Sequence, residues 1–296
     1  MEIKEFIKHL IIEKKVSEST ADAYERDVKY FEKFLKIRGV GKLEDAAGAD
    51  VAAFVLALRE HGRSDATINR RISSVRAFYK FLVSKGEISV NPAADIKTPR
   101  VKRNEIEFLT VDEVEKLLEQ PDETVKGIRD RALLEIMYAT GIKVSEVIEL
   151  KLSDVNLKMG FATLNGDHGR ARIVPIGRPA RAALSSYIST ARKAFMKERD
   201  SEDPDGTLFV NYMGGPLTRQ GCWKILSQCG KAAGIEGKIT PHILRTSFAV
   251  HMVQNGADLK TLQELMGHED VTAMKVYFSM TKNRIKDVYD RTHPRA

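Results

Sequence analysis

Cysteine is scarce in this chain, which has two among 296 residues. Cys222 and Cys229 lie seven positions apart and form no C-x-x-C pair, so neither a disulfide framework nor a zinc site is indicated. We therefore expect two reduced thiols within the hydrophobic core.

Long apolar runs are also missing. No stretch approaches the roughly 18 consecutive apolar residues that a membrane-spanning helix needs. The first fifteen residues, MEIKEFIKHLIIEKK, carry charges throughout, whereas a signal peptide has an uninterrupted apolar centre. The sequence predicts a cytoplasmic protein without a membrane partner.

The excess of positive charge is modest. The chain carries 48 Lys+Arg against 41 Asp+Glu, a net charge of +7 and an isoelectric point of about 9.2. This balance suits a polyanionic partner but does not establish one. The length predicts about two domains, and 43% hydrophobic residues are enough for a sizeable core.

The first ninety residues, 1–90, predict a helical domain. Apolar side chains recur at helical spacing over 3–11 and 24–35, and a third helix is expected over 50–60. A fourth helix has an apolar stripe from Ile68 to Leu82. The residues off this stripe make a cationic and hydroxyl-rich face: Thr67, Arg70, Arg71, Ser74 and Lys80. Such a face is either solvated or a phosphate contact, and the helix alone does not decide between them.

Residues 91–106 predict a basic linker. The stretch NPAADIKTPRVKRNEI has two prolines and no helical periodicity. Its basic side chains are Lys97, Arg100, Lys102 and Arg103. An extended basic segment between two domains can follow a DNA backbone, or be basic for solubility alone.

The second domain, 107–296, predicts helices around a small β-sheet. Thr110 and Glu113 have the spacing of a capping box at a helix start. The other expected elements are a helix ending at Gly141, a β-hairpin over 160–177, a long helix near 179–197, a short strand at TLFV, and helices from Thr218 onward. The predicted fold class is mainly α with a small β-sheet.

The stretch TPHILRTSF carries the first chemical signal. His242 and Arg245, three residues apart, would share one helical face with Cβ atoms about 5 to 6 Å apart, so that both can reach one anionic group. Such a pair is common without function, but His268 and Tyr277 follow in the same domain. A tyrosine can attack a phosphodiester and form a phosphotyrosyl intermediate when cations neutralise the phosphate. The alternative for Tyr277 is a half-buried core tyrosine.

At these residues the chain resembles the tyrosine recombinase (phage integrase) family, in its Xer branch. The stretches that carry the resemblance are TPHILR, GADLKTLQELMGH, the VY containing Tyr277, RIKDVYDRTHPRA, ATGIKVSEVIELKLSDV and LTRQGCWKI in the second domain, and TADAYERDVKYFEKFL and TINRRISSVRAFYKFL in the first. They recur in order and at family spacing, so the resemblance spans both domains.

The resemblance implies a two-domain DNA clamp with a SAM-like core-binding domain and a catalytic domain. It implies that Tyr277 is the nucleophile and that His242, Arg245, His268 and Lys143 form the catalytic cation set. The residues that we expect to contact DNA are Thr67, Arg70, Arg71, Arg76, Lys97, Arg100, Lys102, Arg170, Arg172 and Arg219.

The function implied is site-specific breaking and rejoining of DNA strands, in Xer-like chromosome dimer resolution or in integration. The implied partners are double-stranded DNA, a homo- or hetero-tetramer with another tyrosine recombinase, and an accessory activator. The segment 281–296, with a short apolar stripe, would dock into a neighbouring subunit or pack on its own domain. No cofactor or metal ion is implied.

Two positions depart from the family pattern. Lys143 stands where the family has an arginine, and Asp167, in GDH, stands where the family's GKG has its catalytic lysine. Lysine keeps the charge but loses the two-pronged fork. A carboxylate repels phosphate unless His168, Arg170 or Arg172 takes the place of the lysine. Smaller departures follow at Thr246 and after Tyr277, in YFSM.

These departures leave a second hypothesis open. Each lost charge-stabilising donor would cost about 3 to 4 kcal/mol in the transition state. The alternative is therefore a catalytically impaired relative that binds DNA and assembles with an active partner. A metal-dependent nuclease using His242, His251, His268 and Glu269 has no familiar ligand spacing to support it. A transcription regulator would not need Tyr277.

Overall fold

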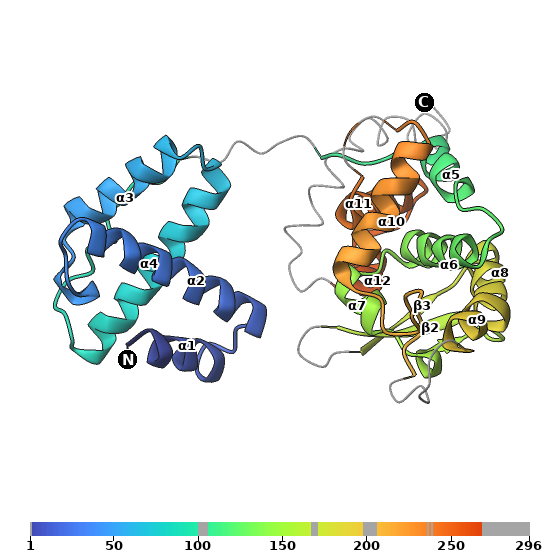
Figure 1. Ribbon diagram of the computed structural model, residues 1–296, viewed down its shortest axis with the longest axis horizontal. Coiled ribbons are helices and arrows are strands. Elements are labelled where there is room, and N and C mark those ends of the chain that lie inside the picture. Colours follow the sequence, from blue (N-terminus) through green and yellow to red (C-terminus); the bar gives the residue numbers. More distant parts are fainter. Residues whose placement is uncertain are drawn as a thin grey trace, which may run out of the picture. The chain divides into compact units, whose positions relative to one another are not determined.

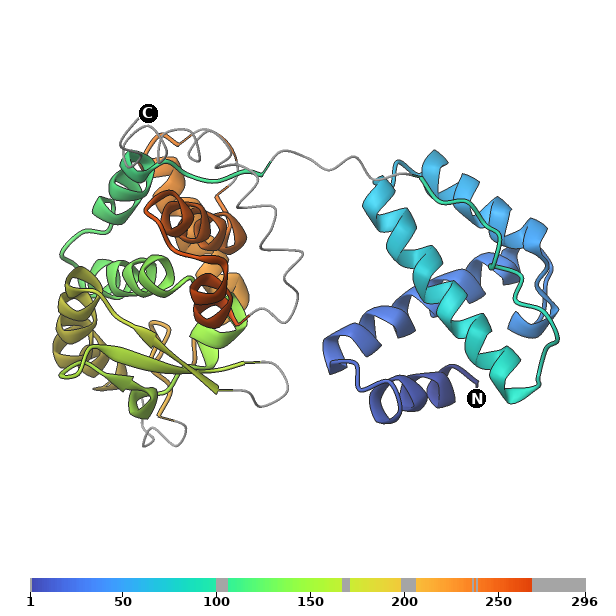
Figure 2. The same ribbon diagram turned by 180° about the vertical axis from the view of Figure 1, so that it is seen from behind.

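The computed structural model describes residues 2–99, 106–166, 171–197, 206–235, 237 and 239–267. The chain forms two compact units that divide between residues 104 and 105 (Figures 1 and 2). The first unit is helical, and the second combines helices with a three-stranded sheet. The predicted fold class is confirmed. None of the helices in the described residues is long and apolar enough to cross a bilayer.

The first unit consists of four main helices, as the sequence predicts. They are α1 (Glu2–Ile12), α2 (Glu18–Ile37), α3 (Gly48–Glu60) and α4 (Asp65–Lys85). Ser17 and Ser64 cap α2 and α4, because each hydroxyl accepts a hydrogen bond from a backbone N–H in the first turn. Gly86, at φ +74°, ends α4 in the left-handed conformation that glycine tolerates.

An aromatic cluster forms the core between these helices. The rings of Phe31 and Phe54 are 4.9 Å apart, and those of Phe6 and Phe78 are 5.4 Å apart, both in edge-to-face geometry. Tyr79 is fully buried and donates to the Leu43 carbonyl at 2.8 Å, so its hydroxyl is satisfied. Of the predicted cationic face of α4, Arg70 and Lys80 are exposed and Thr67 and Arg71 are half-buried, whereas Ser74 is fully buried.

The segment predicted as a linker lies largely on the first unit. Arg76 of α4 donates to the carbonyls of Ala93 and Ile96 at 3.0 and 2.9 Å. Asn69 donates to the carbonyl of Pro99 at 2.9 Å. These bonds attach residues 91–99 to α4, although this stretch contains two prolines and no regular secondary structure.

The second unit alternates helices with a small antiparallel sheet. Its helices are α5 (Val111–Glu119), α6 (Val125–Thr140), α7 (Val144–Glu149), α8 (Arg178–Ser186), α9 (Arg192–Lys197), α10 (Arg219–Ala232), α11 (Pro241–Gln254) and α12 (Leu259–Met266). A single π-helical stretch, Tyr187–Ala191, joins α8 to α9, so that the long helix predicted over 179–197 is continuous. Thr110 and Glu113 make the predicted capping box.

The sheet has the order β1 (Val155–Asn156), β2 (Phe161–Asn165) and β3 (Ala171–Pro175). The predicted hairpin is β2–β3, with Thr163 opposite Ile173. Alternate residues Ala162, Leu164 and Val174 are buried, and Ile173 faces solvent. Figure 1 shows the sheet beside α6, which runs through the middle of this unit.

The prediction of a strand at TLFV, residues 207–210, is wrong. Thr207 and Val210 form only isolated bridges, with Lys151 and Pro216. The segment is held instead by separate contacts, including a hydrogen bond from Tyr187 Oη to the Leu208 carbonyl at 3.0 Å. Cys222 and Cys229 are free and buried, as predicted.

Candidate phosphate-binding site

The first turn of α11 positions the predicted histidine and arginine. Thr240 caps the helix by accepting from the Ile243 N–H at 3.2 Å, and Pro241 occupies its first position, where a missing N–H costs nothing. His242 is exposed, whereas Arg245, one turn later, is buried with 7% of its surface accessible. The helix therefore presents an accessible imidazole next to a fixed guanidinium.

Arg245 is held by two helix C-termini. Its Nη1 donates to the carbonyl of Gly141, which ends α6, and its Nη2 donates to the carbonyl of Met266, the last residue of α12, at 2.6 Å. Carbonyls at a helix C-terminus carry partial negative charge, so they stabilise a buried cation without neutralising it. The two carbonyls therefore hold the guanidinium in one orientation.

No other residue fits at position 141 unless the surrounding structure shifts. Its φ is +58°, and a Cβ there would lie 2.3 Å from Cδ1 of Phe248. The turn places Lys143 two residues after the carbonyl that holds Arg245. Lys143, directly before α7, therefore belongs to the turn whose Gly141 carbonyl binds Arg245.

Glu146 ties this turn to the hairpin. Its Oε2 accepts from the Lys143 backbone N–H at 2.9 Å, and its two oxygens accept from Nη1 and Nη2 of Arg172 at 2.7 and 2.8 Å. Burial alone would raise the pKa of Glu146. The hydrogen bonds from Arg172 and Lys143, with the positive charges of Arg172 and Arg245, outweigh burial and hold this pKa below its usual value.

Arg172 also fixes the end of α12. Its Nε donates to the Leu265 carbonyl at 2.8 Å, and a Cβ at Gly267 would lie 2.9 Å from its Nη1. The side chain therefore joins β3, α7 and α12 directly before position 268. This internal role was not predicted for Arg172.

Three residues in this part of the fold were not predicted. Gly141 was identified only as a helix end. Glu146 lies three residues after Lys143, the spacing of a helix-capping carboxylate, which is the signal that could have found it. Ser247 donates to the Ile243 carbonyl and accepts from the Leu109 N–H, both at 2.8 Å, and so attaches α11 to the start of the unit.

The predicted DNA-contact residues fall into three groups. Lys97 and Arg219 are exposed, and Thr67 is half-buried in the first turn of α4. Arg70, Arg71, Arg76 and Arg172 have partners within the protein. The predicted residues Arg100, Lys102, Asp167, His168, Arg170, His268, Glu269, Tyr277 and the segment 281–296 lie outside the described residues.

The described histidines give no support to a metal-dependent nuclease. His251 is buried, with its Nδ1 2.9 Å from Tyr138 Oη, and burial lowers its pKa. His242 is exposed at the other end of the same helix. Within the described ranges, the carboxylates and imidazoles close enough to share an ion belong to Glu2, Glu44 and Glu87 of the first unit.

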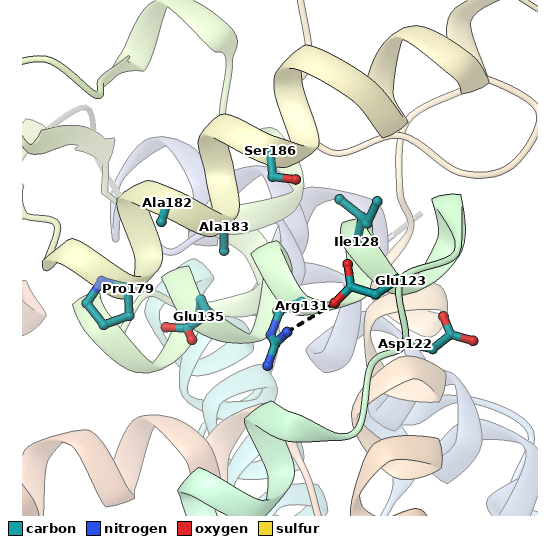
Figure 3. A pocket seen from close by; sticks show the side chains of 9 residues that line it. All are labelled: Asp122, Glu123, Ile128, Arg131, Glu135, Pro179, Ala182, Ala183 and Ser186. Carbon is teal, nitrogen blue, oxygen red and sulfur yellow. Dashed lines mark ion pairs between the residues drawn. The ribbon is translucent and has the colours of Figure 1, made fainter.

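A separate pocket opens between α6 and α8, with a volume of about 330 Å³ (Figure 3). Its polar lining includes three carboxylates, those of Asp122, Glu123 and Glu135, and one cation, Arg131, which is 3.7 Å from Glu123. Burial raises the pKa of Glu135, an effect that Arg131 opposes. Acidic walls disfavour phosphate, so this pocket is not part of the predicted site.

Both units match known families. The N-terminal SAM-like domain of phage integrases matches residues 3–86, and the phage integrase family matches residues 107–284. The chain belongs to the phage integrase family. The tyrosine recombinase XerD of Oceanobacillus iheyensis is 42% identical over 295 residues, covering 99% of this chain and 98% of the relative. This phage integrase family member is therefore a XerD-like tyrosine recombinase.

Solved structures of the family share this fold. The XerH recombinase bound to palindromic difH substrate in a post-cleavage complex has a TM-score of 0.75 at 21% identity, over 90% of this chain and 78% of that one. A lambda integrase tetramer bound to a Holliday junction has a TM-score of 0.72 at 19% identity, over 93% and 76%. The comparisons give no support to the alternative of a catalytically impaired relative.

Proposed function

We propose that the chain is a site-specific DNA recombinase that breaks and rejoins strands through a phosphotyrosyl intermediate at Tyr277. The observation that carries this proposal is the buried, oriented Arg245, which donates to the carbonyl of Gly141 two residues before Lys143, with His242 exposed one helical turn away. A fixed cation at a water-excluded position stabilises charge as it develops on a phosphate, without reorganisation during the reaction.

In the proposed reaction the Tyr277 Oη attacks the scissile phosphorus, and the bond from phosphorus to the leaving 5′ oxygen breaks. The tyrosine loses its proton, the 5′ oxygen gains one, and a 3′ phosphotyrosine remains. A 5′ hydroxyl of the partner strand then attacks this ester, which restores the DNA backbone and frees Tyr277. His242, Arg245, His268 and Lys143 neutralise the non-bridging oxygens.

Arg172 is a poor replacement for the family's proton-donating lysine. Its guanidinium is bound by both oxygens of Glu146 and by the Leu265 carbonyl, and moving it would release the end of α12. We assign to Arg172 the structural role of joining β3, α7 and α12. His168 and Arg170, which lie between β2 and β3 in the sequence, are the candidates for the proton donor.

We further propose that the chain binds double-stranded DNA and acts as a tetramer on two sites, with itself or with a related recombinase. The structural neighbours, which include recombinase–DNA complexes and a tetramer on a Holliday junction, support this assembly. We also expect that an accessory protein activates the chain and that the chain is located in the cytoplasm.

Duplex binding by the full chain is expected to be strongly salt-dependent. If about six to ten phosphates are contacted, affinity falls roughly 10³- to 10⁵-fold between 50 and 200 mM salt. Mobility-shift titrations on a random-sequence duplex measure this slope. The variants Lys97→Gln and Arg219→Gln should each make the slope shallower by about one, since both side chains are exposed and predicted to contact phosphate. Binding that is absent or insensitive to salt would refute the proposal.

A further inference from the structure

A buried acidic residue of α2 contacts the arginines on the cationic face of α4. Asp27 has a side chain that is only 4% exposed. Its Oδ2 accepts from Ser74 Oγ at 3.0 Å and from Nη1 of Arg70, and its Oδ1 lies 3.7 Å from Nε of Arg71. One carboxylate therefore serves two arginines that the sequence assigns to DNA contact.

The two arginines are held in different ways. The side chain of Arg70 is 48% exposed, so one end of its guanidinium is on Asp27 while the rest is accessible. Arg71 is only 14% exposed, with its guanidinium carbon 3.9 Å from the centroid of the Tyr30 ring. Its Nε and Nη1 are buried without a hydrogen-bond partner in the described structure. Arg71 is thus held by the charge of Asp27 and the face of an aromatic ring.

A carboxylate at this place works against simple attraction to DNA. Arg70 and Arg71 alone would carry a charge of +2, and Asp27 reduces the charge of the group to +1. A buried ion pair is also seldom more stable than apolar residues packed in its place. What Asp27 supplies is geometry, because a guanidinium fixed before binding loses less side-chain freedom when it meets a phosphate. It also weakens the electrostatic term that acts on any duplex, whatever its sequence.

We propose that Asp27 is a positioning residue that sets the specificity of DNA binding, by orienting Arg70 and Arg71 and by cancelling one positive charge on this face. The inference rests on the proposed function, since it requires that α4 contacts DNA. It assigns to Asp27 an effect on the ratio of target to non-target affinity that a purely structural carboxylate would not have.

The test is Asp27→Asn in the full chain. Asparagine keeps the shape and an oxygen that accepts from Ser74 and Arg70, but removes the charge. The probes are the duplex that the wild-type chain selects from a randomised pool, and a shuffled duplex of the same length and composition. The expected result is a salt slope on the shuffled duplex that is steeper by about 0.9, several-fold tighter binding to it at low salt, and a lower ratio of target to non-target affinity.

The matched control is Asp22→Asn. Asp22 is an exposed acid on the same helix, so this variant has the same net charge but leaves the arginines in place. It should change the slope on the shuffled duplex far less. Asp27→Asn should also lose its effect on the slope in an Arg70→Gln background, because the inference routes that effect through Arg70.

Ser74→Ala provides a second test, which remains valid even if circular dichroism shows that Asp27→Asn does not fold. It frees Asp27 from its hydroxyl donor without changing charge, so the specificity ratio should fall at an unchanged slope. The inference is wrong if Ser74→Ala leaves the ratio of target to non-target affinity unchanged and a folded Asp27→Asn leaves the salt slope on the shuffled duplex unchanged. The proposed function would still stand. If the wild-type chain shows no salt-sensitive binding, both fail.

Discussion

Replacing Arg245 with alanine should slow formation of the covalent protein–DNA adduct by about 10²- to 10³-fold, the loss typical of one preorganised charge-stabilising donor. Arg245 is buried, and two helix C-termini fix its orientation, so the substitution removes a donor that is oriented before the reaction. Duplex affinity should change by no more than a few-fold, because phosphate contacts over both units supply most of it.

The measurement is a time course of adduct formation on a nicked duplex, with mobility shifts on the same preparations. Arg245→Lys should be intermediate, since it keeps the charge but cannot span the Gly141 and Met266 carbonyls. Arg178→Ala, at an exposed arginine that begins α8, is the matched control and should react at the wild-type rate. Unchanged adduct formation in Arg245→Ala would remove this residue from the site.

Glu146→Gln is expected to destabilise the second unit by about 3 to 5 kcal/mol, as when one partner of a buried ion pair is removed. The side chain of Arg172 is only 11% exposed, and would be left with its charge unpaired between β3, α7 and α12. Urea unfolding followed by tryptophan fluorescence measures this directly. Trp223 is the chain's single tryptophan and lies on α10 of the same unit.

Glu149→Gln is the control for that variant, because Glu149 is the exposed last residue of the same helix. The pH dependence supplies a further check. The folded-state pKa of Glu146 is lowered, so the carboxylate stabilises the fold above its unfolded pKa of about 4.5, and this stabilisation is lost as pH falls through the folded value. The difference between wild type and Glu146→Gln should therefore shrink in acid. A difference that stays constant down to pH 3 would contradict the assignment.

The helices could be predicted because their signals are local. Apolar residues follow one face of α2 and α4, Thr110 and Glu113 have the spacing of a capping box at the start of α5, and Gly141 ends α6. The packing of residues 91–99 was not predicted, because the donors that bind this segment, Asn69 and Arg76, lie on α4. No local pattern reveals such a contact.

The site was predicted only in part, for a similar reason. The spacing of His242 and Arg245 places them in one helical turn, and the family resemblance supplied their role. The pair of Glu146 and Arg172 is 26 residues apart in sequence, and only the β2–β3 hairpin brings its members together. The acid beneath the α4 arginines, Asp27, is 43 residues from Arg70 and was likewise not predicted.

The central claim, that Tyr277 forms a phosphotyrosyl bond within a cation set containing Lys143 and Asp167, is tested most directly by covalent trapping on a nicked duplex with an Xer-type site. The account predicts a denaturant-resistant adduct with the unmodified protein and none with Tyr277→Phe. An adduct that persists in the phenylalanine variant would contradict the account. So would one that forms only after Lys143→Arg and Asp167→Lys are introduced together.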